Sequence, residues 1–151
     1  MSLLEVDDVK ITYRTADSDV HAVNDVSFSI EEGDNYGLVG ESGSGKSTLA
    51  KSVLGLLDDN GEVRSGSIRF NGRELTELSE REWRDVRWEE IAYIPQSAMD
   101  SLDPVMTVGQ QIRQAIHKHE DVSDAAANER VDEVFEIVGL DPARTEDYPH
   151  E

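Results

Sequence analysis

Nine consecutive residues combine glycines, a lysine and hydroxyl groups at a spacing that suits the binding of phosphate. The stretch Gly40-Glu41-Ser42-Gly43-Ser44-Gly45-Lys46-Ser47-Thr48 fits the pattern G-x-x-x-x-G-K-[ST], the phosphate-binding P-loop. Its glycines adopt backbone angles that side chains forbid, so consecutive amides can turn inward around phosphate oxygens. Lys46 is expected to reach the β- and γ-phosphates, and the Ser47 hydroxyl to ligate Mg²⁺. A glycine-rich turn that only caps a helix is the alternative.

The residues on either side of this loop are predicted to form a strand and a helix. The apolar run Tyr36-Gly37-Leu38-Val39 is typical of a short buried strand, and 47–57 is typical of a helix. That helix would point its unpaired N–H groups and the positive end of its dipole at a bound anion. A strand, a glycine loop and a helix in this order favour a triphosphate site over a helix cap.

Two strands are predicted ahead of the loop, and they are expected to pair in antiparallel fashion. Residues 3–13 alternate imperfectly between apolar and polar side chains, whereas 23–30 alternate cleanly. After the loop and its helix, 58–65 is rich in turn-forming residues and is predicted to be a loop. Ile68 and Phe70 then mark a short strand.

The second half of the chain is predicted to be mainly helical. Ser79 and Glu82 form a capping box that opens a short helix through Arg87, and the apolar run 91–94 suits a buried strand. Thr107 and Gln110 form a second capping box. A later apolar stripe, closed by a glycine, is typical of a helix that packs on a core: Ala127, Val131, Val134, Phe135, Val138 and Gly139.

The chain is strongly acidic. Its 151 residues include 33 acidic and 14 basic side chains, which give a formal net charge of −19. Such a surface repels nucleic acid and anionic lipid, so neither is expected as a direct ligand. Acidic residues spread along the whole sequence favour a protein of a salt-loving organism (a halophile), in which strong screening lowers the self-repulsion. An ordinary acidic cytosolic protein is the alternative.

Composition restricts the chain further. The absence of cysteine excludes disulfides and thiolate metal sites within the chain. No apolar run approaches the length of a membrane span, and the first residues do not form a signal pattern, so a soluble cytoplasmic protein is expected. The four histidines (His21, His117, His119 and His150) form no convincing set of metal ligands and are expected at the surface.

Four stretches together resemble the N-terminal half of the ATP-binding subunit of ATP-binding cassette (ABC) transporters. The resemblance is to the branch that powers uptake of dipeptides, oligopeptides or nickel. Besides the P-loop wording at 40–48, the strand 20–28 resembles the strand before that loop, and 94–104 resembles the Q-loop. Tyr148-Pro149-His150-Glu151 resembles the residues before the family's L-S-G-G-Q signature. The resemblance covers essentially the whole chain, and the Q-loop wording is its most specific part.

The resemblance implies an α/β fold of the P-loop NTPase class, with an N-terminal antiparallel β subdomain, a partial helical subdomain and a truncated core sheet. The chain would be the N-terminal part of one ATP-binding domain, 1–151. A β subdomain and nucleotide core would occupy about 1–96, and a helical subdomain about 97–151.

The resemblance also implies roles for individual residues. Tyr13 stands where the family places an aromatic ring on the adenine of ATP; a strand tyrosine that fills the core is the alternative. Gln96 corresponds to the glutamine that contacts Mg²⁺ and the attacking water; a solvent-facing loop residue is the alternative. Mg²⁺ would thus be held by Ser47 and Gln96. Residues 97–111 match the surface that meets transmembrane permease subunits, and a second ATP-binding subunit would complete a dimer on the inner face of the cell membrane.

Several parts of the family's machinery have no counterpart in these residues. The signature motif, the Walker B aspartate, the catalytic glutamate and the switch histidine are all absent, and no glutamate present is assigned as the base. In the family, two missing strands lie between the P-loop strand and the Q-loop strand. We therefore expect exposed apolar edges, poor stability or aggregation, weak ATP binding and no turnover from this chain.

Three functions remain open at this point. The first is an energy-coupling subunit of an ABC transporter, for peptide import, with ATP hydrolysis in the complete protein. The second is a truncated nucleotide-binding fragment without ATPase activity. The third, a soluble P-loop kinase or GTPase, is disfavoured because no guanine-reading N-K-x-D occurs and the Q-loop wording would have no explanation.

Overall fold

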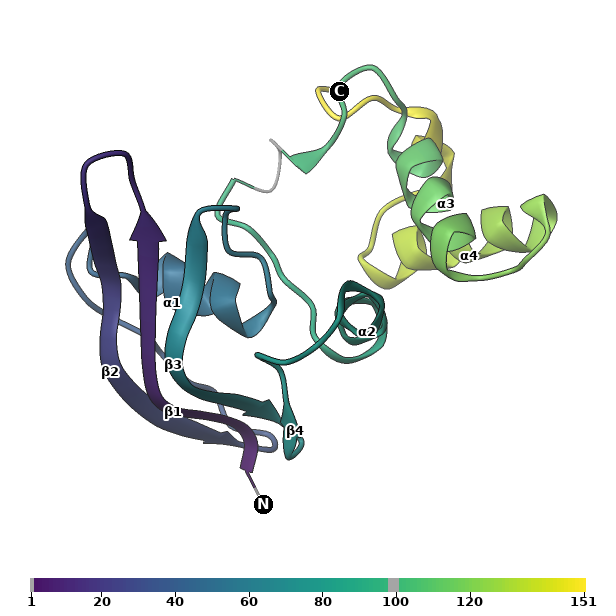
Figure 1. Cartoon of the computed structure of the whole chain (residues 1–151). Coiled ribbons are helices and arrows are strands. Elements are labelled where there is room, and N and C mark those ends of the chain that lie inside the picture. The colour runs from purple at the N-terminus through teal and green to yellow at the C-terminus, as the bar shows by residue number, and fades with distance from the viewer. Residues whose placement is uncertain (1, 98–100) are drawn as a thin grey trace. The chain divides into compact units, whose positions relative to one another are not determined.

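The computed structural model describes residues 2–97 and 101–151, and it divides the chain into two compact units (Figure 1). The first unit ends at Ala92 and the second comprises Tyr93–Glu151. Three residues of the predicted Q-loop segment, Ala98, Met99 and Asp100, lie outside the described residues. Each unit has its own hydrophobic core.

The first unit is built on a four-stranded antiparallel sheet with the strand order β2-β1-β3-β4 (Figure 1). Its strands are β1 (Ser2–Arg14), β2 (Asp19–Glu31), β3 (Gly61–Phe70) and β4 (Arg73–Glu74). The β1–β2 pair confirms the predicted antiparallel strands ahead of the P-loop. The loop predicted over 58–65 is wrong beyond Asn60, because Gly61 already pairs with Tyr13 of β1.

A bulge in β1 keeps its apolar side chains on one face of the sheet. Val6 and Val9 are three residues apart, a spacing that would put them on opposite faces of a regular strand. The register against β2 shifts between them, and Asp8 adopts a φ of 47°. Gly66 of β3 faces the bulge with a φ of 90°, where a Cβ would lie 2.5 Å from the Asp7 carbonyl oxygen. Both valines are consequently buried.

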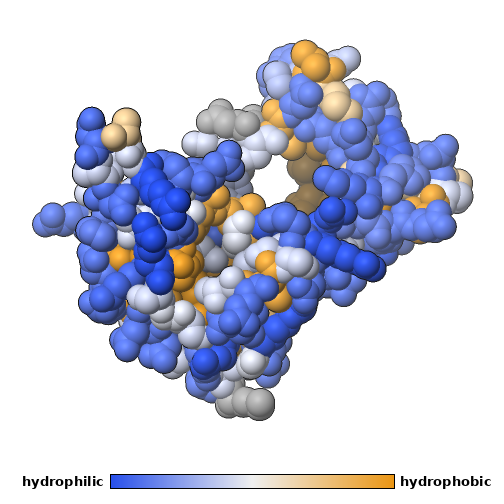
Figure 2. Space-filling view, in the orientation of Figure 1, coloured by the Kyte–Doolittle hydropathy of each residue, from blue (hydrophilic) through white to orange (hydrophobic). Residues whose placement is uncertain are grey.

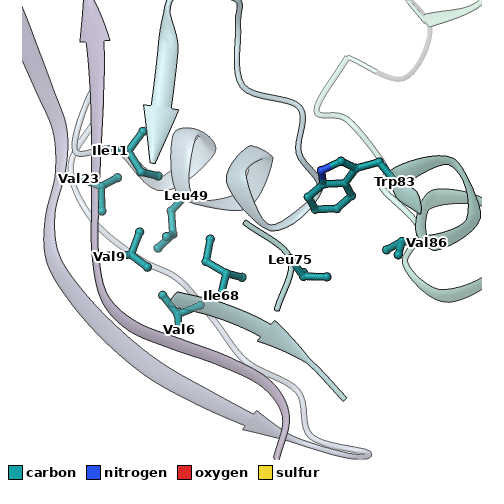
Figure 3. Close-up of a cluster of buried hydrophobic side chains, with 9 residues drawn as sticks. All are labelled: Val6, Val9, Ile11, Val23, Leu49, Ile68, Leu75, Trp83 and Val86. Atoms are coloured by element: carbon teal, nitrogen blue, oxygen red, sulfur yellow. The ribbon is translucent and has the colours of Figure 1, made fainter. Parts of the chain in front are cut away.

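Three helical elements supply the rest of this core (Figure 3). Leu49 comes from α1 (Lys46–Val53), Trp83 from α2 (Glu80–Asp85), and Val86 from η1 (Val86–Glu90), a π-helical turn. The capping box of Ser79 and Glu82 is confirmed. The predicted end of that helix at Arg87 is wrong, because the chain continues in the π turn. The remaining core side chains are Val6, Val9, Ile11, Val23, Ile68 and Leu75.

Helix α1 ends earlier than the predicted 47–57. Gly55 adopts a left-handed φ of 60°, and its N–H donates to the Ser52 carbonyl oxygen. The N–H of Leu56 donates to the Lys51 carbonyl oxygen at 2.9 Å. This pair of bonds is the Schellman arrangement, which terminates a helix at a glycine. The helix therefore stops at Val53, four residues before its apolar pattern does.

Two apolar runs that were predicted to be buried strands do not form strands. The run 36–39 is irregular, and Val39 is 90% exposed. The run 91–94 is also irregular, and Ile94 is 85% exposed. A strand needs a neighbouring strand for its backbone hydrogen bonds, and the described residues place none beside either run. Tyr36 instead stacks on Phe28 of β2, with ring centroids 4.9 Å apart.

The second unit contains α3 (Val108–His119), α4 (Asp124–Ile137) and the 3-10 turn η3 (Pro142–Glu146). The capping box of Thr107 and Gln110 is confirmed at the start of α3. Gly109 permits a close approach of η3, because a Cβ on it would lie 2.7 Å from the Thr145 carbonyl oxygen. The predicted stripe on α4 is partly confirmed: three of its residues are buried with Ile116, namely Ala127, Val131 and Phe135.

Candidate nucleotide-binding site

Lys46 folds back over the predicted phosphate loop. Its Nζ donates to the carbonyl oxygen of Gly40 at 2.8 Å, to that of Glu41 at 2.6 Å, and to Ser44 Oγ at 3.3 Å. These three acceptors come from the start and the middle of the loop, so the ammonium group bridges it. A cation at that position attracts the oxygens of a phosphate group bound in the same loop.

Gly45 fixes where the loop meets the sheet. It is the N-cap of α1, and it adopts a φ of 88° without any side-chain cap. A Cβ on Gly45 would lie 2.2 Å from the carbonyl oxygen of Ala22 in β2 and 3.2 Å from a methyl carbon of Val23. Both the backbone angle and the close approach of β2 therefore require glycine here. The first turn of α1 carries no acidic residue, which leaves its positive dipole end available to an anion.

The loop is accessible from solvent. Residues 40–44 and Ser47 are exposed, whereas Gly45 and Lys46 are half-buried. A cavity of about 250 Å³ lies between the loop and β2, lined by residues that include Asn24, Val39 and Lys46. Ligand pockets typically measure about 300–1,000 Å³, so this cavity is at the small end for a ligand.

Tyr13 lies near the end of β1, where it pairs with Val20 of β2 and Gly61 of β3. Its ring packs on the backbone of Gly61, at a distance that leaves no room for a side chain there. The residue is half-buried. A ring with one covered face and one accessible face is compatible with stacking on a base and equally with covering the sheet edge.

Gln96 belongs to the second unit, in which it lies exposed in a turn that also includes Ser97. Of the surface predicted to meet a permease, about 97–111, the structure describes Ser97 and 101–111, and the latter includes the first turn of α3. Gln111 holds this segment together, because its side chain accepts from the Asp103 N–H at 2.8 Å and donates to the Asp103 carbonyl oxygen at 2.9 Å. Val105 is 78% exposed on the same segment.

A protein-only metal site does not occur among the residues that the structure describes, since they contain no cluster of three or more histidine or acidic side chains with suitable geometry. A hydroxyl such as Ser47 binds Mg²⁺ together with phosphate oxygens, and that arrangement needs no such cluster. Within the same described ranges, no helix has the length and apolarity needed to cross a membrane.

Two contacts around the loop were not predicted. The sequence does not reveal that the Ala22 carbonyl oxygen limits the space at Gly45, because this contact depends on how β2 passes the loop. Arg87, whose side chain reaches the other end of α1, was assigned no role either. Ala22 and Gly45 are both small enough for close packing, but their positions in the sequence do not indicate that they contact each other.

A loop of the G-x-x-x-x-G-K-[ST] pattern, a lysine bonded across it and a following helix without a side-chain cap are features of the P-loop class of nucleotide-binding proteins. The family model described as ABC transporter matches residues 23–150 of the chain. This match covers more than half of the chain, so the chain belongs to the ABC transporter family.

Curated relatives agree with this assignment. The chain is 45% identical over 151 residues to the oligopeptide transport ATP-binding protein OppD of Salmonella typhimurium. It is 41% identical over 152 residues to the dipeptide transport ATP-binding protein DppD of Lactococcus lactis. The alignments cover 99% of this chain, but only 45% and 44% of those two relatives. The chain thus spans less than half the length of the relatives it matches.

Solved structures support the fold. The ATP-binding cassette MJ0796, in a dimeric post-hydrolysis state bound to ADP and Pi, superposes with a TM-score of 0.80 at 21% identity. That match covers 97% of this chain and 62% of the other. The component cbiO1 of an ABC transporter complex from Clostridium perfringens gives a TM-score of 0.73 at 22% identity. The expected fold class, part of an ABC ATPase with an N-terminal antiparallel subdomain, is therefore confirmed.

Proposed function

We propose that the chain is the ATP-binding part of an energy-coupling subunit that drives peptide import. The observation that carries the proposal is the P-loop at 40–48, held by Gly45 against β2 and centred on Lys46. The names of the relatives supply the substrate class, because the first ones matched are oligopeptide and dipeptide transport ATP-binding proteins. The complete protein would hydrolyse ATP, act as a dimer and lie on the cytoplasmic face of the membrane against permease subunits.

The proposed division of labour follows the chemistry of the loop. Lys46 and the amides of 40–48 hold the phosphates, and the Ser47 hydroxyl ligates Mg²⁺. Tyr13 stacks on adenine, and Gln96 contacts Mg²⁺ and the attacking water. The permease contact involves about 97–111. The ion, when bound, neutralises charge on the phosphates; Lys46 and the positive end of the α1 dipole supply the rest of that neutralisation from this chain.

Nucleotide binding is tested by titrating the chain with a fluorescent ATP analogue. Lys46→Ala should weaken binding by about 10- to 100-fold, the value of one charge-assisted hydrogen bond. Lys51→Ala is the matched control, because Lys51 lies on the same helix and pairs with the exposed Asp58. The nucleotide proposal fails if Lys46→Ala binds as tightly as the unchanged chain, or if both lysine variants lose affinity equally.

Peptide import is tested in cells that produce the whole transporter. Cells that carry the Lys46→Ala allele should lose uptake of labelled di- and oligopeptides while nickel uptake continues. Unchanged peptide uptake would refute the peptide assignment and leave the nucleotide site standing. ATP turnover is measured separately from binding, because hydrolysis also requires a metal-holding aspartate and a catalytic glutamate, which have no counterpart in these residues.

A further inference from the structure

An arginine from a different element holds the C-terminal end of α1. Arg87 Nε donates to the Leu54 carbonyl oxygen at 2.8 Å, and Arg87 Nη2 donates to the Gly55 carbonyl oxygen at 2.7 Å. Carbonyl groups at the end of a helix have no partner within the helix, and they lie at the negative end of its dipole. The planar guanidinium satisfies two of them at once, with its charge in the favourable position.

Trp83 and Gly55 fix the orientation of this arginine. The guanidinium carbon of Arg87 lies 5.1 Å from the centre of the Trp83 ring, over its face. Trp83 is only 7% exposed and lies beside the last turn of α1 (Figure 3). A Cβ on Gly55 would lie 2.4 Å from the ring, so only glycine lets the indole approach this turn. The ring thereby limits where the guanidinium can go.

The opposite end of the same helix is the phosphate loop. Helix α1 has eight residues, which corresponds to a length of about 12 Å. Gly45 packs against Ala22 at one end, and Arg87 binds Leu54 and Gly55 at the other. Only two turns separate Arg87 from the loop, with Leu49 anchored in the core between them, so we infer that loosening the C-terminal end of α1 also changes how firmly the start of the helix is held.

The π turn that carries Arg87 also leads to the segment before Gln96. The Ile91 N–H donates to the Val86 carbonyl oxygen at 2.9 Å, which closes the wide turn of η1. The chain then runs directly into 91–96. Turns of this type interrupt helices at functional positions more often than elsewhere. Arg87 therefore binds the end of α1 from the turn that leads directly into 91–96.

We propose that Arg87 is a positioning residue of the phosphate loop: it clamps the C-terminal end of α1 and thereby fixes the backbone of residues 40–48. Its bearing on nucleotide affinity rests on the proposed function, whereas its effect on the loop backbone does not. Two measurements on the whole protein that contains these residues separate these parts. The variants are Arg87→Ala, Arg87→Gln and Arg87→Lys, with Arg84→Ala as control, because Arg84 is an exposed arginine of neighbouring α2.

The first measurement is amide hydrogen exchange of the nucleotide-free chain. Arg87→Ala and Arg87→Gln should accelerate exchange of the hydrogen-bonded Ser44 and Leu49 amides at least about tenfold, because the hydrogen bonds of Arg87 to Leu54 and Gly55 are lost or weakened, and leave β1 and β3 protected. Arg87→Lys should give an intermediate rate, because an ammonium group keeps the positive charge but lacks the planar pair of donors that binds both carbonyl oxygens. A purely structural role would accelerate exchange in the strands as well.

The second measurement is the Kd for the fluorescent ATP analogue, at a temperature well below unfolding. The Kd of Arg87→Gln should rise about tenfold, whereas that of Arg84→Ala should not change. If Arg87→Ala does not fold, the glutamine and lysine variants decide. Unchanged exchange of the Ser44 and Leu49 amides in the Arg87 variants overturns the inference, as does an equal effect of Arg84→Ala. Faster exchange of these two amides, in a chain that binds no nucleotide, would support the clamp and refute the proposed function.

Discussion

Replacing Gly45 by alanine tests the geometry of the loop most directly. The alanine must keep a φ of 88°, and left-handed backbone costs a residue with a side chain about 1–2 kcal/mol. Its Cβ would also lie 2.2 Å from the Ala22 carbonyl oxygen, a backbone atom that cannot swing away. Forcing an atom into such a contact costs roughly 1–3 kcal/mol more. We therefore expect Gly45→Ala to lower the free energy of unfolding by about 2–5 kcal/mol.

Gly43→Ala is the matched control, because Gly43 has a similar φ of 80° but no heavy atom within 4 Å of the new Cβ. It should cost only the backbone strain, about 1–2 kcal/mol. The assay is urea unfolding followed by the fluorescence of Trp83 in the core and half-exposed Trp88, combined with the titration of the ATP analogue. Equal losses of stability in the two variants would refute the close approach of β2 to the loop.

The remaining predictions concern charge. Because the chain carries a net charge of −19, we expect its urea midpoint to rise with KCl up to about 1 M, where the screening length is about 3 Å; a flat response would refute the halophile interpretation. Burial raises the pKa of Glu74, but hydrogen bonds from Ser67, Thr76 and the Ile68 N–H outweigh it and leave that pKa below 4.5. A lowered folded-state pKa gives stability that is present above the unfolded-state value and is lost as the pH falls through the folded-state value. Glu74→Gln should therefore lower stability at neutral pH and flatten the loss below pH 4.5; an unchanged acid profile would contradict this.

Most of the molecular surface is hydrophilic on the face shown in Figure 2. Ion pairs join exposed side chains, such as Arg14 with Glu62 at 2.8 Å and Lys10 with Asp25 at 3.0 Å. Surface pairs of this kind contribute at most about 1 kcal/mol each, and salt screens them. With 33 acidic against 14 basic residues, most acidic groups repel one another, which is why salt is expected to stabilise the chain.

Local chemistry made much of the fold predictable. Both capping boxes occur as predicted, because a serine or threonine and a side chain three residues later bind the same helix turn. The β1–β2 pair follows from alternation and a polar turn. The P-loop was identified from its glycines, Lys46 and Ser47, since each residue type has a separate physical task.

The predictions that failed have one cause in common: each of these features depends on residues far away in the sequence. The runs 36–39 and 91–94 have the apolarity of strands, but a strand forms only against a neighbour that pairs with its backbone. The bulge at Asp8 could not be predicted from the sequence. In the sequence, its extra residue only breaks the alternation of apolar and polar side chains, which does not by itself indicate a bulge. Helix α1 ends at Val53, and Gly55 just beyond it packs against Trp83, a residue far along the chain.

The same dependence explains how a short helix can organise a binding loop. Eight residues are too few for a helix to be stable alone, so α1 owes its existence to packing and to contacts at its two ends. Leu49 attaches its middle to the sheet, Gly45 admits β2 at its start, and Arg87 closes its end. Residues 40–48 supply the chemistry of phosphate binding. Their placement is set by side chains and backbone that lie outside the motif, and substitutions there should alter affinity without touching a phosphate contact.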